Sequence, residues 1–188
     1  MSPNRAVPWQ LAVELEAARA RGIVDACLSA EREAKLPQGL LLAIASRETG
    51  CRDVVGDGGH GRGVLQIDDR EHREWLAAQG ANAPGALPPV GEACRYAARL
   101  VVDALVFART RGVSPRDRLK FALSAYDAGT ERALEGYRRG DSDLGTAGGD
   151  YGADVVERLR VVQRWLSGRP DEPQRPAPRR SGSSGQTR

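Results

Sequence analysis

The stretch that decides the fold is QGLLLAIASRE, residues 38–48. It is apolar on nearly every side, which is typical of a helix buried all round. Gly50 follows closely, and a glycine at that point can end a helix in the left-handed conformation. We therefore predict a buried central helix whose C-terminal end carries one carboxylic acid, Glu48, beside a loop.

The rest of the chain is mostly helical in pattern. Six glycines among residues 50–63 predict a loop, and residues 64–67 form a short strand-like run. No segment shows sustained alternation of apolar and polar residues, so we predict a mainly α fold with at most a small β-hairpin at the glycine-rich loop. Helical spacing, with Ser114 and Pro115 as a cap and first turn, predicts further helices over 8–19, 23–35, 69–79, 92–109, 114–126, a short segment after 129, and 154–166.

Length and charge indicate one folded domain with a tail. The chain has 188 residues and a net charge of +3. Residues 168–188 are rich in Pro, Arg, Ser and Gly and carry five Arg against two acidic residues, so the whole excess of charge lies there. We predict a domain over 1–167 and a flexible tail over 168–188. A charge-balanced domain argues against a nucleic-acid partner.

Two further features bear on the compartment. The longest apolar run, Leu40 to Ala45, is far too short to span a bilayer, and residues 1–10 lack the apolar core of a secretory signal. We expect no membrane insertion. Cys27, Cys51 and Cys94 allow either one disulfide with a free thiol or three thiols.

Glu48 and the acids downstream of it are the candidate chemistry. A carboxyl group held against apolar neighbours has a raised pKa, so it can stay protonated near neutral pH and act as a general acid. Asp57, Asp68 and Asp69 follow in the next 21 residues, and any of them could activate a water. Each acid also has an ordinary interpretation, as a solvated or ion-paired helix end, a turn residue or a helix cap.

The ordered motifs resemble those of the goose-type lysozymes and the related lytic transglycosylases, which act on bacterial peptidoglycan. The motifs are S-R-E (46–48), G-D-G-G-H-G (56–61), G-x-L-Q-I-D (63–68), Y-D-A-G (126–129) and G-D-Y-G-A-D-V-V (149–156). The resemblance spans roughly residues 30–166. It implies a lysozyme-like helical domain and cleavage of the β-1,4 bond between N-acetylmuramic acid and N-acetylglucosamine, without a cofactor.

The resemblance also implies roles for single residues. Glu48 matches the catalytic acid, and Asp57 and Asp68 match the acidic positions that position or activate water. The positions that match substrate-binding residues are Gln66, His72, Tyr126 and Tyr151. Asp127 replaces the Asn usual in Y-N-A-G, which adds a carboxylate near the expected cleft.

Several alternatives stay open. The two Asp favour hydrolysis, whereas a lytic transglycosylase, which leaves 1,6-anhydromuramoyl ends, needs only one acid/base. A non-catalytic peptidoglycan-binding module would also keep the cleft. We expect a monomer that acts on glycan strands outside the cell or at the cell wall, by an export route that the sequence leaves open.

Three weaker signals are set aside. Gly56, Gly58 and Gly61 satisfy G-x-G-x-x-G, but a helix precedes them where a dinucleotide site needs a strand. The His and Cys residues match no zinc-ligand spacing. Trp9, Trp75 and Trp165 fit core or interface positions better than sugar platforms.

Overall fold

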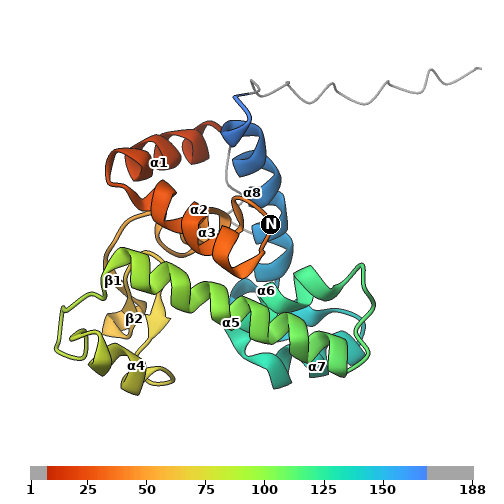
Figure 1. The fold of residues 1–188 in the computed structure, drawn as a ribbon. Coiled ribbons are helices and arrows are strands. Elements are labelled where there is room, and N and C mark those ends of the chain that lie inside the picture. The colour runs from red at the N-terminus through yellow and green to blue at the C-terminus, as the bar shows by residue number, and fades with distance from the viewer. Residues whose placement is uncertain (1–7, 169–188) are drawn as a thin grey trace, which may run out of the picture.

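Helices make up most of the molecule (Figure 1). The computed structural model describes residues 8–168, so the predicted tail lies, from residue 169 on, outside the described residues. The α-helices of the described part are α1 (Pro8–Ala20), α2 (Ile23–Ala34), α3 (Leu40–Thr49), α4 (Arg73–Ala78), α5 (Val90–Thr110), α6 (Arg118–Ala128), α7 (Thr130–Arg138) and α8 (Tyr151–Leu166). The prediction of a mainly α fold is confirmed.

Helix α3 is the buried centre of the fold. Residues 40–45 are each 0% exposed, and Gly50 ends the helix with a φ of 60°. No residue next to the helix caps its first turn with a side chain. Instead the buried carboxylate of Glu31 on α2 accepts hydrogen bonds from the backbone N–H groups of Gly39 (2.7 Å) and Leu41 (2.6 Å). The predicted central helix is confirmed, and a distant residue caps it.

A small antiparallel sheet follows α3. Its strands are β1 (Val55–Gly56), β2 (Gly61–Arg62) and β3 (Ile67–Asp68), in the order β1-β2-β3. Gly56 pairs with Gly61, and Gly61 with Asp68. The predicted strand over 64–67 is wrong for residues 64–66, which form the turn between β2 and β3. Val64 and Leu65 are apolar because that turn is buried, since both are 0% exposed.

Three helix starts differ from prediction by three residues or more. Helix α4 begins at Arg73, four residues after the predicted start, because residues 69–72 form a turn and a bend. Helix α6 begins at Arg118 and not at Ser114, whose backbone N–H donates to the Tyr137 hydroxyl (3.1 Å). Helix α8 begins at Tyr151, three residues before the predicted start. The buried carboxylate of Asp143 accepts hydrogen bonds from the N–H groups of Gly152 (2.7 Å) and Ala153 (3.0 Å), which stabilises that extra turn.

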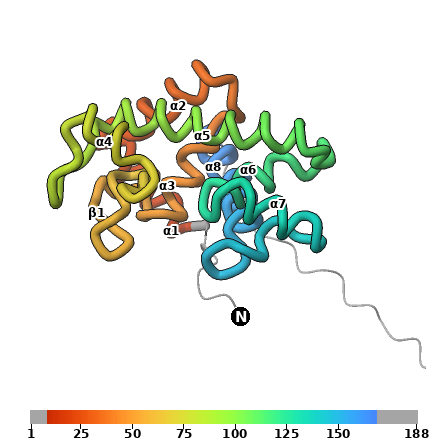
Figure 2. The backbone as a smooth tube through the Cα atoms, turned by 90° about the horizontal axis from the view of Figure 1, so that it is seen from below, coloured from red at the N-terminus to blue at the C-terminus, as the bar shows by residue number. Residues whose placement is uncertain are grey.

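Helix α5 crosses the whole molecule, and two regions lie along it. The sheet and α4 lie near its N-terminal end, and α6 and α7 near its C-terminal end (Figures 1 and 2). The two regions meet where the Tyr126 hydroxyl, on α6, donates to the Leu65 carbonyl in the β2–β3 turn (2.7 Å). Glu48, at the end of α3, and its partner Tyr151 connect this junction to α8.

Candidate active site

Glu48 lies in the last turn of α3 and is partly exposed. Burial raises the pKa of its carboxyl from 4.5 to about 7. The Tyr151 hydroxyl donates a hydrogen bond to Glu48 Oε1 and opposes this rise, whereas the negative charges of Asp127 and Asp57 add to it. A carboxyl group with this pKa is still substantially protonated near neutral pH, as a general acid must be.

The neighbouring arginine, Arg47, lowers the pKa of Glu48 through its charge but forms no ion pair with it. Arg47 donates to Asp150 (3.1 Å) and to Asp154 (3.2 Å), and both acids lie at the start of α8. Within residues 8–168, Glu48 has no ion pair within 4.0 Å. The ordinary interpretation of Glu48 as half of an ion pair is therefore not what the structure shows.

Asp57, directly after β1, and Asp68, in β3, are joined by an arginine that the sequence reasoning missed. One Nη2 atom of Arg70 lies 2.6 Å from Asp57 Oδ2 and 2.6 Å from Asp68 Oδ2. This arginine holds the pKa of the Asp68 carboxyl below its usual range. A D-x-R spacing over residues 68–70 was the available signal, but only the fold shows that Asp57 shares the same arginine.

Asp69, the third candidate acid, is committed elsewhere. Its carboxylate contacts His60 Nδ1 (2.8 Å) and the buried Arg62 (2.6 Å). These contacts tie the tip of the glycine-rich loop to the segment that follows β3. Asp69 therefore holds the loop in place and has less freedom than Asp57 to contact a water.

Gln66 supports the loop from beneath. Its Nε2 donates to the carbonyls of Val54 (3.1 Å) and Gly63 (2.7 Å). Its Oε1 occupies the space above Gly56 and Gly61, where an added Cβ would lie only 2.0 Å and 2.2 Å away. The two glycines in the motif are thus required by the glutamine that packs against them.

Glu48 interacts with Tyr126, Tyr151 and Asp127. His72, in contrast, lies apart from this group. Burial raises the pKa of both tyrosines well above 10, so their hydroxyls stay protonated as donors. Asp127 Oδ2 accepts from the Ala147 N–H (2.7 Å). His72 lies at the start of α4 and contacts the Tyr96 hydroxyl (2.9 Å) on α5.

A polar chain behind Glu48 fixes the end of α3. The Ser46 hydroxyl donates to Glu14 on α1 (2.6 Å) and accepts from Arg158 on α8 (2.7 Å). Arg158 in turn donates to Asp154 (2.6 Å), the acid that also binds Arg47. Ser46 is therefore a structural residue, and the chain joins three helices directly behind the candidate acid.

Other candidate sites carry less chemistry. Within residues 8–168, no three His, Cys, Asp or Glu side chains are grouped so as to hold a metal ion, and no helix there is long and apolar enough to cross a membrane. Cys27, Cys51 and Cys94 are buried free thiols. Trp75 stacks on Tyr96, whereas Trp9 is 63% exposed and so does not lie in the core, one of the two positions predicted for it.

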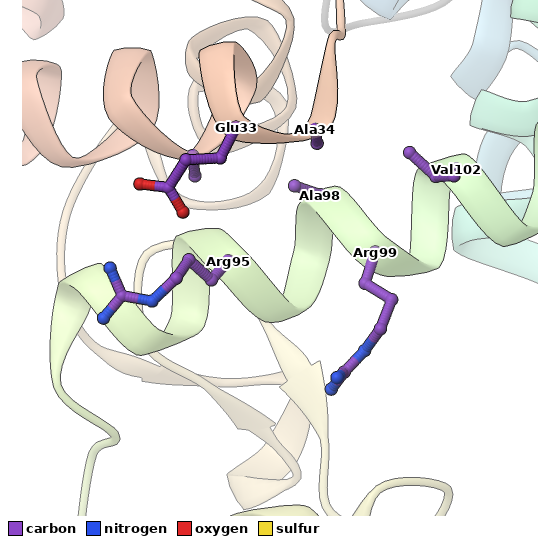
Figure 3. A pocket seen from close by; sticks show the side chains of 7 residues that line it. Glu33, Ala34, Arg95, Ala98, Arg99 and Val102 are labelled. Atoms are coloured by element: carbon purple, nitrogen blue, oxygen red, sulfur yellow. The ribbon is translucent and has the colours of Figure 1, made fainter.

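A pocket on the surface between α2 and α5 contains none of the candidate site residues. Figure 3 shows its apolar floor flanked by Glu33, Arg95 and Arg99. Its other lining residues are Ala30, Ala34, Ala98 and Val102, and its one carboxylate, Glu33, is exposed. The candidate chemistry is confined to the region around Glu48.

The chain is similar in sequence to a known lysozyme. No family model matches the chain. A search of curated proteins finds lysozyme g of Gallus gallus, which is 29% identical over 137 residues. The match covers 66% of this chain and 56% of the relative, so the chain spans little more than half of that protein. The similarity to lysozyme g thus extends over about two thirds of this chain.

Proposed function

We propose that the protein cleaves the β-1,4 bond between N-acetylmuramic acid and N-acetylglucosamine in peptidoglycan, as a lysozyme-like muramidase. The observation that carries the proposal is the Glu48 carboxyl at the end of an apolar helix, with a pKa of about 7 and a hydrogen bond from Tyr151. Protonated Glu48 donates its proton to the glycosidic oxygen as the bond breaks. Asp57 or Asp68 directs the attacking water.

The surroundings of Glu48 suit a bulky glycan. Gly58 and Gly59, at the tip of the loop, have no atom within 4 Å of the position a Cβ would occupy, so this surface is open. Asp57, at the start of the same tip, is exposed. The similarity to lysozyme g supports peptidoglycan as the glycan in question.

Replacement of Glu48 by glutamine tests the proposal. Glu48→Gln keeps the size of the side chain but has no acidic proton, so we expect at least about a 100-fold loss in the release of soluble sugars from purified cell walls. Glu33→Gln is the matched control, because Glu33 is exposed on α2 beside the pocket of Figure 3. If Glu48→Gln folds normally and keeps wild-type activity, the proposed mechanism is wrong.

Lytic transglycosylation is the second candidate, and one observation favours it. Arg70 engages both Asp57 and Asp68, whereas Glu48 has no ion pair among residues 8–168. A transglycosylase needs only such a single acid/base, since the 6-hydroxyl of the muramic acid is the nucleophile. Mass spectrometry of digests decides between the two, because anhydro ends are lighter than hydrolysed ends by one water, about 18 mass units.

A further inference from the structure

The Arg70 guanidinium binds the two aspartates of the candidate site unequally. Asp68 accepts from Arg70 Nε (2.9 and 3.1 Å), from Nη2 (2.6 Å) and from the Arg70 backbone N–H (2.8 Å). Among residues 8–168, the Asp57 carboxylate accepts only one bond, from Arg70 Nη2 to Oδ2 (2.6 Å). Asp68 therefore fixes the guanidinium, whereas Asp57 is held by a single nitrogen, Nη2.

This asymmetry separates the roles of the two acids. Both oxygens of Asp68 already accept hydrogen bonds, so the carboxylate has little capacity left to orient a water. Asp57 Oδ1 accepts no hydrogen bond from any residue in 8–168 and is exposed. The charge of Asp57 also raises the pKa of Glu48, so the two carboxyl groups interact electrostatically.

The backbone conformation at Asp57 explains why the side chain needs a hydrogen-bond partner to hold it in place. Asp57 has a φ of 45°, a left-handed conformation that is unfavourable for a residue other than glycine, and it precedes two glycines at an exposed tip. A loop of this kind does not by itself fix a side chain to the precision that catalysis requires. A planar guanidinium anchored on the sheet supplies a fixed point, as a flexible ammonium would not.

We propose that Arg70 is a positioning residue of the hydrolytic step, anchored on Asp68, which holds Asp57 so that its free oxygen orients the attacking water. This inference rests on the proposed function and assigns the water-directing role to Asp57. As the glycosidic C–O bond breaks, the Glu48 proton passes to the leaving oxygen. The water oxygen bonds to the sugar C1, and its proton passes to Asp57.

The test compares Arg70→Gln with a matched control on soluble peptidoglycan fragments. Arg73→Gln is the control, because Arg73 is an exposed arginine at the start of α4 that none of the site contacts involve. We expect Arg70→Gln to lower kcat roughly 10- to 100-fold with little change in KM, since a misplaced group costs rate but not binding. Arg70→Lys, which keeps the charge, should recover part of the loss.

Double substitution shows whether Arg70 acts through Asp57. Asp57→Asn should lower kcat by about 100-fold or more, and adding Arg70→Gln to it should cause little further loss, because both changes remove the same function. Asp68→Asn should resemble Arg70→Gln.

Two results would overturn the inference: Arg70→Gln matching Arg73→Gln, or Asp68→Asn losing more activity than Asp57→Asn. Glu48→Gln in the same assay distinguishes failure of this inference from failure of the proposed function. An active Glu48→Gln variant contradicts the proposed function, whatever the Arg70 variants show.

Discussion

Glu48 lies between two neighbours whose effects on its pKa are opposite. The Tyr151 hydroxyl donates to the carboxylate and so favours the ionised form, whereas the negative charge of Asp127 favours the protonated form. Burial has the largest effect, and with all these contributions the pKa of Glu48 is about 7. Since a general acid works only when protonated, activity should fall as the pH rises through about 7.

Replacing Asp127 should move that fall in activity to lower pH. Asp127→Asn removes a charge that raises the pKa of Glu48 but keeps an oxygen for the Ala147 N–H, so the local structure is preserved. Glu48 then loses its proton at a lower pH. The measurement is the pH dependence of kcat/KM on soluble fragments, repeated at high salt, where the shift should shrink if it is electrostatic.

Tyr151→Phe gives the matched change in the opposite direction. It removes the donor that stabilises the carboxylate, so the pKa of Glu48 should rise and the fall in activity should move to higher pH. Tyr151 is only 2% exposed, and phenylalanine keeps its packing. Shifts of the same sign in the two variants, or no shift in either, would contradict this account of Glu48.

At the scale of elements, the start of α3 depends on a residue of α2. Glu31→Ala leaves the N–H groups of Gly39 and Leu41 buried without their acceptor. We expect a loss of about 2–4 kcal/mol in the free energy of unfolding, because an unsatisfied buried donor costs about 1–3 kcal/mol.

Urea denaturation measures this loss as a lower midpoint with an unchanged slope. Glu33→Ala, on the exposed side of the same helix, is the control and should cost less than about 0.5 kcal/mol. Equal losses in the two variants would contradict the capping role of Glu31.

The elements differ in how far the sequence predicts them. Residues 40–45 and Gly50 predict α3 correctly, because burial on every side leaves its mark on composition. The caps do not follow from local sequence: Glu31 acts from another helix, and Asp143 adds a turn to α8 from residues that precede it. The strand predicted over 64–67 is wrong for residues 64–66 for a related reason, because a buried turn has the same apolar composition as a strand.

The residues of the candidate site also differ in how far the sequence predicts them. Motif order predicts Glu48, Asp57 and Asp68 as the acids of interest, and the structure places the two Asp on one arginine. Arg70 could not be inferred, because its contact with Asp57 spans 13 residues and exists only once the sheet has formed. Gln66 was predicted to line a cleft, while its contacts support the loop from below.

At the scale of the whole molecule, the site is a junction of separate parts. The Tyr126–Leu65 bond joins the sheet region to α6, and the chain through Ser46 and Arg158 joins α1, α3 and α8 behind Glu48. No single element carries the site. Changes in any of these helices can therefore alter the position of the acid relative to the loop.

Charge is also distributed unevenly over the whole chain. This predicts that residues 168–188 contribute to adhesion and the residues before them to cleavage. The net charge of +3 belongs to residues 168–188, while residues 1–167 are balanced. Deleting residues 168–188 should weaken adhesion to anionic cell walls at low salt, because exposed charges interact over a Debye length of about 30 Å at 0.01 M and about 8 Å at 0.15 M. Cleavage of small soluble glycans should be unchanged, since all the candidate site residues precede the deletion.

A full-length variant with the five tail arginines changed to serine separates the effect of charge from that of length and should adhere as weakly as the deletion. Loss of activity on soluble glycans in the deletion would instead show that the tail belongs to the catalytic unit.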